Sequence, residues 1–250
     1  MSACYLYAII HAAAFSSVLP SDIGRGVWEM PLRMVFHDEL AAVIGEWSGK
    51  RIVGNNPADP SWREAVWQHE RVIETLMLHG ATLPVRFGTI LADEERVRTL
   101  LVERQTTFMA DLAYLAGKVE MGLRVLWERP ESEEGEPSSM MIKGRGGEGP
   151  GIRYLQQRAA ELKREEVVQA RGKRLAEQLN AALCSVTVDS HLQILQTKRL
   201  LLSAAYLVEQ EAIETFRKEV ETLRRSYPHL HFLVSGPWPA YNFVSKGPNR

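Results

Sequence analysis

Residues 200–234 read LLLSAAYLVEQEAIETFRKEVETLRRSYPHLHFLV and carry the clearest structural pattern of this 250-residue chain. Residues 200–208 are almost entirely apolar, which predicts a long buried strand. In residues 209–225 apolar side chains recur three or four positions apart, which predicts an amphipathic helix. Residues 229–234 then predict a closing strand. This stretch therefore indicates a strand–helix–strand arrangement, in which the helix covers a sheet.

The residues before this stretch predict a long helix and one more strand. The helix runs from Ile152 to about Leu183, and at 1.5 Å per residue it would be about 45 Å long. That length predicts either a projecting helix or a helical hairpin that turns near Gly172. Residues 185–188 predict a short strand. The order helix, strand, strand, helix, strand resembles most of a ferredoxin-like split βαβ unit, so we expect a C-terminal ferredoxin-like domain over residues 152–250.

The N-terminal residues 1–128 predict a separate α+β domain with two helices against one mostly antiparallel sheet. The first helix begins near Ser61, which can cap it, and Glu64 lies where a capping box needs it. Gly80 is well placed to end this helix. A second helix is expected over residues 93–116. Short apolar stretches predict strands at residues 4–10, 32–36, 40–44, 82–91 and 119–127.

Residues 129–151 differ in composition from the sequence on either side. Glutamates from Glu131 to Glu136 are followed by a glycine-rich run from Gly144 to Gly151, with prolines among them. Such a stretch buries too little apolar surface to offset the entropy lost on ordering. We therefore expect a flexible linker here, between two α+β domains.

Composition excludes several classes of protein. Hydrophobic residues make up 45% and charged residues 24% of the chain, as in ordinary globular proteins. The net charge of -1 gives no broad attraction to nucleic acid or to an anionic membrane. The apolar N-terminus lacks a preceding basic residue and is too short to span a bilayer, so we expect a cytoplasmic protein. Cys4 and Cys184 fit no metal or redox spacing and are expected to be two buried free thiols in a reducing compartment.

Side chains with catalytic or metal-binding chemistry are scattered. The sequence lacks the Gly-x-Ser-x-Gly and His-Glu-x-x-His motifs. His69 lies on the apolar face of the first helix and is either a buried core histidine or a metal ligand. His229 and His231 share one face of a strand. They supply two possible metal ligands, and a metal site would also need a carboxylate or a third imidazole nearby. We predict no catalytic residue, no cofactor and no metal, with a ferredoxin-like small-ligand-binding protein or enzyme of unknown activity as the alternative.

Residues 235–244, SGPWPAYNFV, form the most unusual segment of the chain. Two prolines flank Trp238, so the segment cannot be a central strand. Large aromatic side chains at this density are seldom left in water. Two compatible interpretations follow: Trp238, Tyr241 and Phe243 pack back and lock the C-terminus onto the other domain, or they form an anchor for a protein partner.

The same segment resembles the closing motif of the gas vesicle protein F/L family (GvpF/GvpL), usually Thr-Gly-Pro-Trp-Pro-Pro-Tyr-Ser-Phe-Val. Residues 83–89 resemble the family's Leu-Pro-x-Arg-Phe-Gly-Thr strand, and residues 201–208 its Leu-x-Asn-Ala-Ala-Tyr-Leu-Val strand. Residues 5–9 resemble its opening strand, and residues 151–155 its Gly-x-x-Tyr-Leu entry to the long helix. The chain departs from these motifs at Ser203, Ala240 and Asn242, and Met121 stands where a tryptophan is common in the family.

This resemblance implies a two-domain α+β protein that is a minor component or assembly factor of gas vesicles, the gas-filled protein shells that give cells buoyancy. It implies a structural protein and no enzyme. The expected partner is the small, hydrophobic main shell protein, GvpA, along with other gas vesicle proteins, and the expected location is the gas vesicle within the cytoplasm. Neither nucleic acid nor a membrane is expected as a partner. The candidate protein-binding residues are Trp238, Tyr241 and Phe243.

Overall fold

A computed structural model gives the fold, and it confirms the predicted α+β class. The structure describes residues 3–15, 19, 23–47, 59–127, 150–194, 197 and 199–245. The chain forms two units. The first unit contains residues 1–121, 207–210 and 236–250, and the second contains residues 122–206 and 211–235. None of the described helices combines the length and apolarity that a membrane span needs.

The first unit is built on an antiparallel sheet in the order β2-β3-β1-β4, with β5 also paired to β1. Its strands are β1 (Ala3–His11), β2 (Leu32–His37), β3 (Leu40–Trp47), β4 (Thr82–Pro84) and β5 (Ile90–Leu91). β1 lies at the centre and is buried from Cys4 to Ile10, which explains its unbroken apolar run. The single strand expected over residues 82–91 is instead divided into β4 and β5 by a turn in which Gly88 has a φ of +84°.

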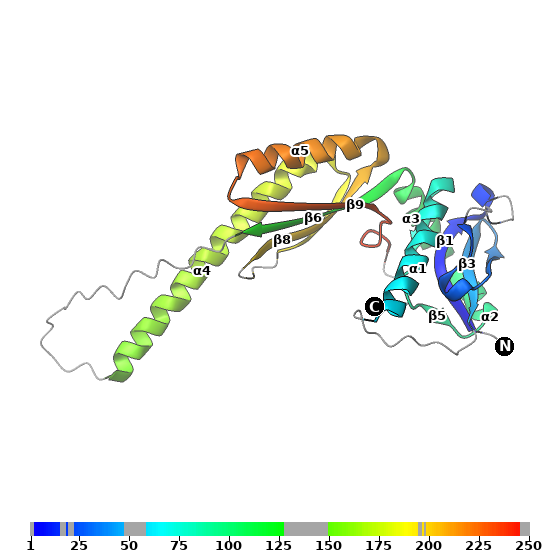
Figure 1. Ribbon diagram of the computed structural model, residues 1–250, viewed down its shortest axis with the longest axis horizontal. Helices are drawn as coiled ribbons and strands as arrows, with labels where there is room; N and C mark the ends of the chain where they lie inside the picture. The colour runs from blue at the N-terminus through cyan, green and yellow to red at the C-terminus, as the bar shows by residue number, and fades with distance from the viewer. Residues whose placement is uncertain are drawn as a thin grey trace, which may run out of the picture. The chain divides into compact units, whose positions relative to one another are not determined.

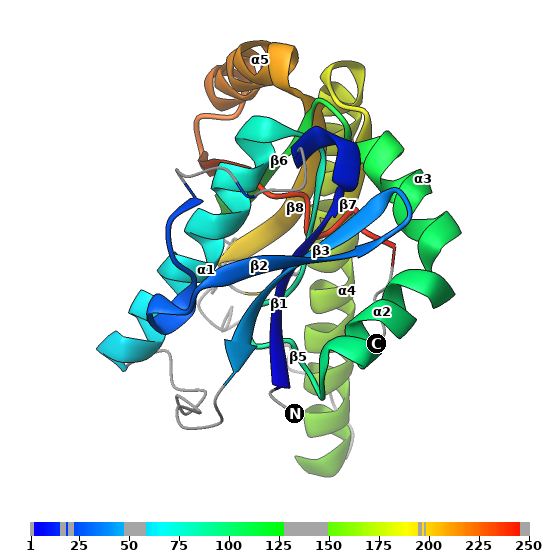
Figure 2. The ribbon, with the colours of Figure 1, turned by 90° about the vertical axis from the view of Figure 1, so that its right-hand side faces the viewer.

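Three helices cover this sheet (Figure 2): α1 (Pro60–His79) on one face, and α2 (Glu94–Glu103) with α3 (Gln105–Leu115) on the other. The first helix is confirmed, but its cap is Asp59, whose carboxylate accepts the Ser61 amide at 2.8 Å. The second expected helix is divided at Arg104, which leaves the helical conformation with φ -118° and ψ 13°.

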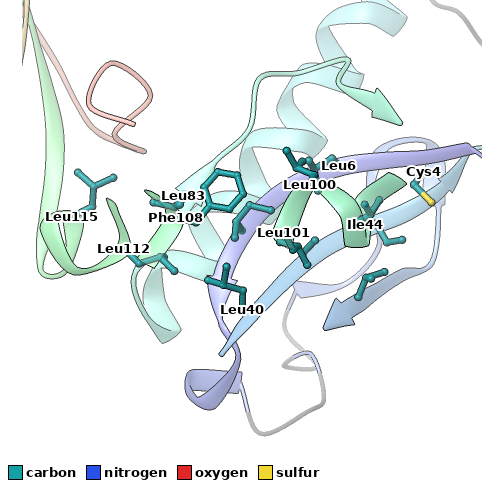
Figure 3. Close-up of a cluster of buried hydrophobic side chains, with 14 of the residues drawn as sticks. Cys4, Leu6, Leu40, Ile44, Leu83, Leu100, Leu101, Phe108, Leu112 and Leu115 are labelled. Atoms are coloured by element: carbon teal, nitrogen blue, oxygen red, sulfur yellow. The ribbon is translucent and has the colours of Figure 1, made fainter. Parts of the chain in front are cut away.

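A β-bulge in β1 sends its side chains to two separate hydrophobic clusters. Cys4 and Leu6 face α2 and α3, and Tyr5 faces α1. The pairing of β1 with β3 shifts between Leu6 and Ala8, so Tyr7 and Ala8 both face α1 before alternation resumes. We call the two clusters the aliphatic face, drawn in Figure 3, and the aromatic face. The aliphatic face is formed by Cys4, Leu6, Ile9, Val35, Leu40, Ala42, Ile44, Leu83, Val97, Leu100, Leu101, Phe108, Leu112, Leu115, Leu207 and Ala240. The aromatic face is formed by Tyr5, Tyr7, Ala8, Ile10, Phe15, Ile23, Val27, Ala41, Val43, Ala65, Val72 and Leu76, with His69 and Phe87 in ring contact with its tyrosines.

The second unit is built on a sheet with the strand order β7-β8-β6-β9. Its elements are β6 (Lys118–Trp127), α4 (Pro150–Leu183), β7 (Asp189–Gln193), β8 (Leu200–Glu209), α5 (Ile213–Ser226) and β9 (Leu230–Trp238). Figure 1 shows α4 and α5 on the same side of this sheet. The chain order β-α-β-β-α-β is that of a ferredoxin-like unit. β6 supplies the first strand, which the sequence analysis assigned to the N-terminal domain.

The long helix runs without a break from Pro150 to Leu183, so the helical hairpin near Gly172 is wrong. Gly172 instead permits close packing, because a Cβ there would lie 2.9 Å from Trp127 Cη2. The short strand expected at 185–188 is also wrong: Cys184–Val186 form a 3₁₀ turn and the strand begins at Asp189. Cys184 is exposed in this turn, so only Cys4 is the buried free thiol that was expected.

The last strand continues beyond the predicted residues 229–234 as far as Trp238. Pro237 therefore lies within β9, which tolerates it because β9 is an edge strand of the sheet.

The two units differ from the predicted division of the chain into residues 1–128 and 152–250. The boundary between the units falls within β6, β8 and β9. β6 pairs with strands from the C-terminal half of the chain, and residues 236–250 belong to the first unit. Of the predicted linker, residues 129–149 lie outside the described part of the chain.

Candidate protein-binding site

The second residue of the predicted binding segment, Gly236, adopts a conformation that favours glycine. Gly236 has a φ of +107°, and a Cβ there would lie 2.8 Å from the carbonyl oxygen of Glu120. Beyond β9 the chain turns, with the Tyr241 amide donating to the Pro239 carbonyl at 2.8 Å. The Phe243 amide donates to the Ala240 carbonyl at 3.1 Å. We call residues 240–245 the tail segment.

Two buried carboxylates hold the tail segment, and each accepts both a backbone and a side-chain donor from one residue. Glu120 of β6 accepts the Asn242 amide at 3.0 Å and the Asn242 side-chain Nδ2 at 2.6 Å. Asp111 of α3 accepts the Ser245 amide at 3.0 Å and the Ser245 hydroxyl at 2.6 Å. Hydrogen bonds to an ionised acceptor are stronger than those between neutral groups, so these four bonds fix the conformation of the tail segment.

A third carboxylate, that of Glu70 on α1, accepts the Tyr241 hydroxyl at 2.9 Å. Burial raises the pKa of Glu70 above its usual value, and the hydrogen bond from Tyr241 opposes that rise. The pKa of Tyr241 is also raised, first by burial and then by the nearby Glu70 charge. Tyr241 therefore stays a neutral donor. We call Glu70, Asp111 and Glu120, with the adjoining aliphatic face, the tail site.

The structure separates the three predicted binding residues into two groups. Tyr241 bonds to Glu70, and Phe243 packs with Val244 against the aliphatic face, in which Ala240 is buried. The side chain of Trp238 remains 40% exposed. Packing of the tail onto its own unit thus accounts for Tyr241 and Phe243, while Trp238 is accessible to a partner.

The three carboxylates of the tail site were not predicted from the sequence. Two of them occupy positions at which the hydrophobic pattern predicts an apolar residue. Glu120 stands between apolar Val119 and Met121 in a buried strand, and Asp111 lies on the apolar stripe of its helix beside Leu112. A charged residue in a buried position needs a partner, although the pattern does not say which one.

His69, one of the candidate metal ligands, is a hydrogen-bonded core residue. Its Nε2 donates to the Val85 carbonyl at 2.8 Å, and its Nδ1 accepts from the Tyr5 hydroxyl at 3.1 Å. Burial lowers the pKa of His69 to about 4, so the ring is neutral near neutral pH. The described residues contain no group of three or more histidine, cysteine or acidic side chains that could hold a metal ion.

The outer surface of α1 carries two exposed apolar side chains that the sequence analysis did not single out. Trp67 is 71% and Leu78 is 82% exposed, and they lie three helical turns apart on the same side of the helix. Among the described residues of the first unit, Trp67 and Trp238 are the tryptophans with exposed side chains.

Comparison with known proteins agrees with this fold. The gas vesicle synthesis protein GvpL/GvpF family matches residues 3–245. Gas vesicle protein L of Streptomyces sp. (strain CB03234) is 28% identical over 96% of this chain and 92% of its own length. Gas vesicle protein F of the same strain is also 28% identical, over 96% of this chain and 98% of its own. The crystal structure of GvpF from Anabaena sp. PCC7120 has the same fold, with a TM-score of 0.72, 19% identity, and coverage of 99% of this chain and 98% of that one. The chain therefore belongs to the GvpL/GvpF family of gas vesicle proteins.

Proposed function

We propose that this protein binds the main hydrophobic shell protein of gas vesicles and supports vesicle nucleation or assembly as a structural component without catalytic activity. Membership of the GvpL/GvpF family supports a role in gas vesicles. The observation that carries the binding step is the exposed side chain of Trp238, one of the three residues that the sequence analysis named.

Trp238 has the features of a binding anchor. It ends an edge strand, and the tail segment just beyond it is fixed by hydrogen bonds from Tyr241, Asn242 and Ser245. The backbone that carries Trp238 is thus ordered on both sides, and tryptophan is among the residues that most often dominate interface energies. A very apolar shell protein would bury the exposed part of this ring. Tyr241 and Phe243 act by holding the anchor.

The test is co-expression of the tagged full-length chain with the main shell protein, followed by a pull-down. We expect the wild type to retain the shell protein and the Trp238→Ala variant to lose it. Trp67→Ala is the matched control, because it removes a more exposed tryptophan from the same unit. Full-length variants are needed, since cutting the chain within residues 131–149 would separate β6 from its partners β8 and β9. Equal retention by wild type and Trp238→Ala, or none by either folded protein, would overturn the proposal.

A further inference from the structure

We propose that the tail site is a peptide-recognition site that accepts the tail segment of a second copy of this chain as well as its own, so that copies can be linked by exchange of residues 240–245. The exchange requires only this protein. It therefore goes beyond the proposed binding of the shell protein and can be tested separately from it.

The contacts in the tail site are specific for the sequence that they hold. Glu120 needs a residue that offers a backbone amide and a side-chain donor together, and Asn242 supplies both. Asp111 makes the same demand, which Ser245 meets with its amide and hydroxyl. The spacing between the two captured residues and the apolar Phe243 and Val244 between them define a short motif. Any copy of that motif offers the same donors and the same apolar contacts.

The tail segment is also bound as a ligand would be bound. Residues 240–245 belong to no helix or strand, and the backbone bonds described within residues 239–243 are local. Contacts to the rest of the first unit run through Glu70, Asp111, Glu120 and the aliphatic face. Because no strand pairing holds the tail segment, the site can release it without breaking up a sheet.

The buried carboxylates explain why the site is expected always to be filled. With the tail segment in place, Asp111 and Glu120 are nine-tenths or more buried, and loss of the four hydrogen bonds from Asn242 and Ser245 is costly. The chain's own tail segment fills the site at low concentration, because the covalent connection gives it a high effective concentration. Where many copies are close together, as in an assembling structure, a neighbour's tail segment can replace it. Exchange of an identical element in this way links copies without a new interface.

The test uses two full-length variants that cannot close on themselves. The tail variant, Asn242→Ala with Ser245→Ala, has an intact site and a defective tail segment. The site variant, Asp111→Asn with Glu120→Gln, has an intact tail segment and a defective site. Only the mixture contains both an intact tail segment and an intact site. These lie on two different chains, so their binding joins the chains. We expect a one-to-one heterodimer by native mass spectrometry in the mixture, and no such dimer in either variant alone. A mixture that stays monomeric, with both variants folded by circular dichroism, would overturn the proposal.

A second measurement covers the case in which the site variant fails to fold. A fluorescent peptide of residues 236–245 is titrated into the tail variant and into the wild type, and its anisotropy is followed. We expect binding to the tail variant that is about tenfold tighter or more than to the wild type, whose site is already filled. The same peptide with both Asn242→Ala and Ser245→Ala is the control and should not bind. Absence of binding by the native peptide would overturn recognition, and peptide binding without a heterodimer would overturn exchange between copies.

Discussion

The two faces of the first unit's sheet are built from different side chains, although the same strand, β1, supplies both. Toward α2 and α3 it sends Cys4, Leu6 and Ile9 into a cluster that is mainly aliphatic. Toward α1 it sends Tyr5 and Tyr7, whose rings meet His69 at centroid distances of 5.7 and 5.3 Å. The aliphatic face is held by burial of apolar surface, which is not directional. The aromatic face is held by burial and also by specific hydrogen bonds.

Those hydrogen bonds tie loops to the central strand. The Tyr7 hydroxyl accepts the Val27 amide at 2.8 Å, and the Tyr5 hydroxyl accepts the Gly88 amide at 3.0 Å. A buried donor or acceptor that loses its hydrogen-bond partner destabilises the folded state, because water cannot replace the partner there. Mutations in the aliphatic face should therefore change stability through side-chain volume, whereas mutations in the aromatic face should also change it through loss of hydrogen bonds and through pH.

The largest effect is expected from a cavity in the aliphatic face. Leu101 is fully buried there, and Leu101→Ala should lower the free energy of unfolding by about 2–5 kcal/mol, because it removes apolar contacts and leaves a void. Urea denaturation measures this change. Val102→Ala on the same helix is the control, since Val102 is 54% exposed and its truncation should cost about 0.5 kcal/mol or less. Similar losses in both variants would contradict the assignment of this cluster as core.

The next effect is a pH dependence that belongs to the aromatic face. Folded His69 has a pKa of about 4, against 6.5 for a free histidine, so between these values the unfolded chain binds a proton that the folded chain does not. Stability is therefore complete above about pH 6.5 and falls as the pH drops toward 4, by about 3 kcal/mol from this residue alone. Urea denaturation of the wild type and of His69→Gln across this range measures the difference in slope.

His79→Gln is the matched control for this pH dependence, because His79 lies on the same helix but is exposed. The change in slope caused by His69→Gln should exceed the change caused by this control. The raised pKa of Glu70 has the opposite effect, because it adds stability as the pH falls. Glu70 is present in the wild type and in both variants, so its contribution is common to all three. The comparison between variants therefore isolates His69. An unchanged slope in His69→Gln would show that the ring is not buried as a neutral base.

A single hydroxyl should matter on the aromatic face. Tyr7→Phe removes the acceptor of the buried Val27 amide, and the free energy of unfolding should fall by about 1–3 kcal/mol because that donor is left unpaired. Hydrogen exchange should show faster exchange at the Val27 amide. In the control, Tyr114→Phe on α3, the ring is 39% exposed and the change should stay within about 0.5 kcal/mol. Unaltered Val27 exchange in Tyr7→Phe would contradict the role given to this hydroxyl.

Sequence patterns predicted the elements whose buried residues repeat regularly. β1, α1, α4, β8 and α5 were predicted in type and approximate extent, because burial of one stripe or of a whole strand leaves a clear periodicity. The bulge at Tyr7 and the division of the second helix at Arg104 were not predicted, since each is a local break that depends on packing. β6 was predicted as a strand but not with its partners, because strand pairing is set by tertiary contacts and not by local propensity.

The candidate site shows the same limit. The sequence identified Trp238, Tyr241 and Phe243, because a tryptophan between two prolines followed closely by two more aromatic residues is unusual. The acceptor for Tyr241 lies 171 residues away in the chain, and the partner of Asn242 lies 122 residues away. The sequence pattern of one segment does not indicate which distant residues it contacts. For His69 the sequence left two interpretations open, and its two hydrogen bonds within the core decided between them.

The smallest effect compares one phenylalanine from each face, both of them partly buried. Phe87 meets Tyr5, His69 and Trp62 edge to face, with ring centroids 6.2, 5.6 and 5.8 Å apart. Phe243 packs against the aliphatic face. Leucine keeps most of the apolar volume at either site but loses the ring geometry, which is worth about 0.5–1.5 kcal/mol for an aromatic pair.

Phe87→Leu should therefore lower the free energy of unfolding by about 1 kcal/mol more than Phe243→Leu does. Urea denaturation of both variants at neutral pH, where His69 is neutral, measures this difference. If the two variants lose the same stability, the Phe87 ring contributes only apolar volume to its contacts. The aromatic face then differs from the aliphatic face by its hydrogen bonds alone. A larger loss in Phe87→Leu would show that ring geometry adds a second directional component, independent of the hydroxyl of Tyr7 and of the protonation of His69.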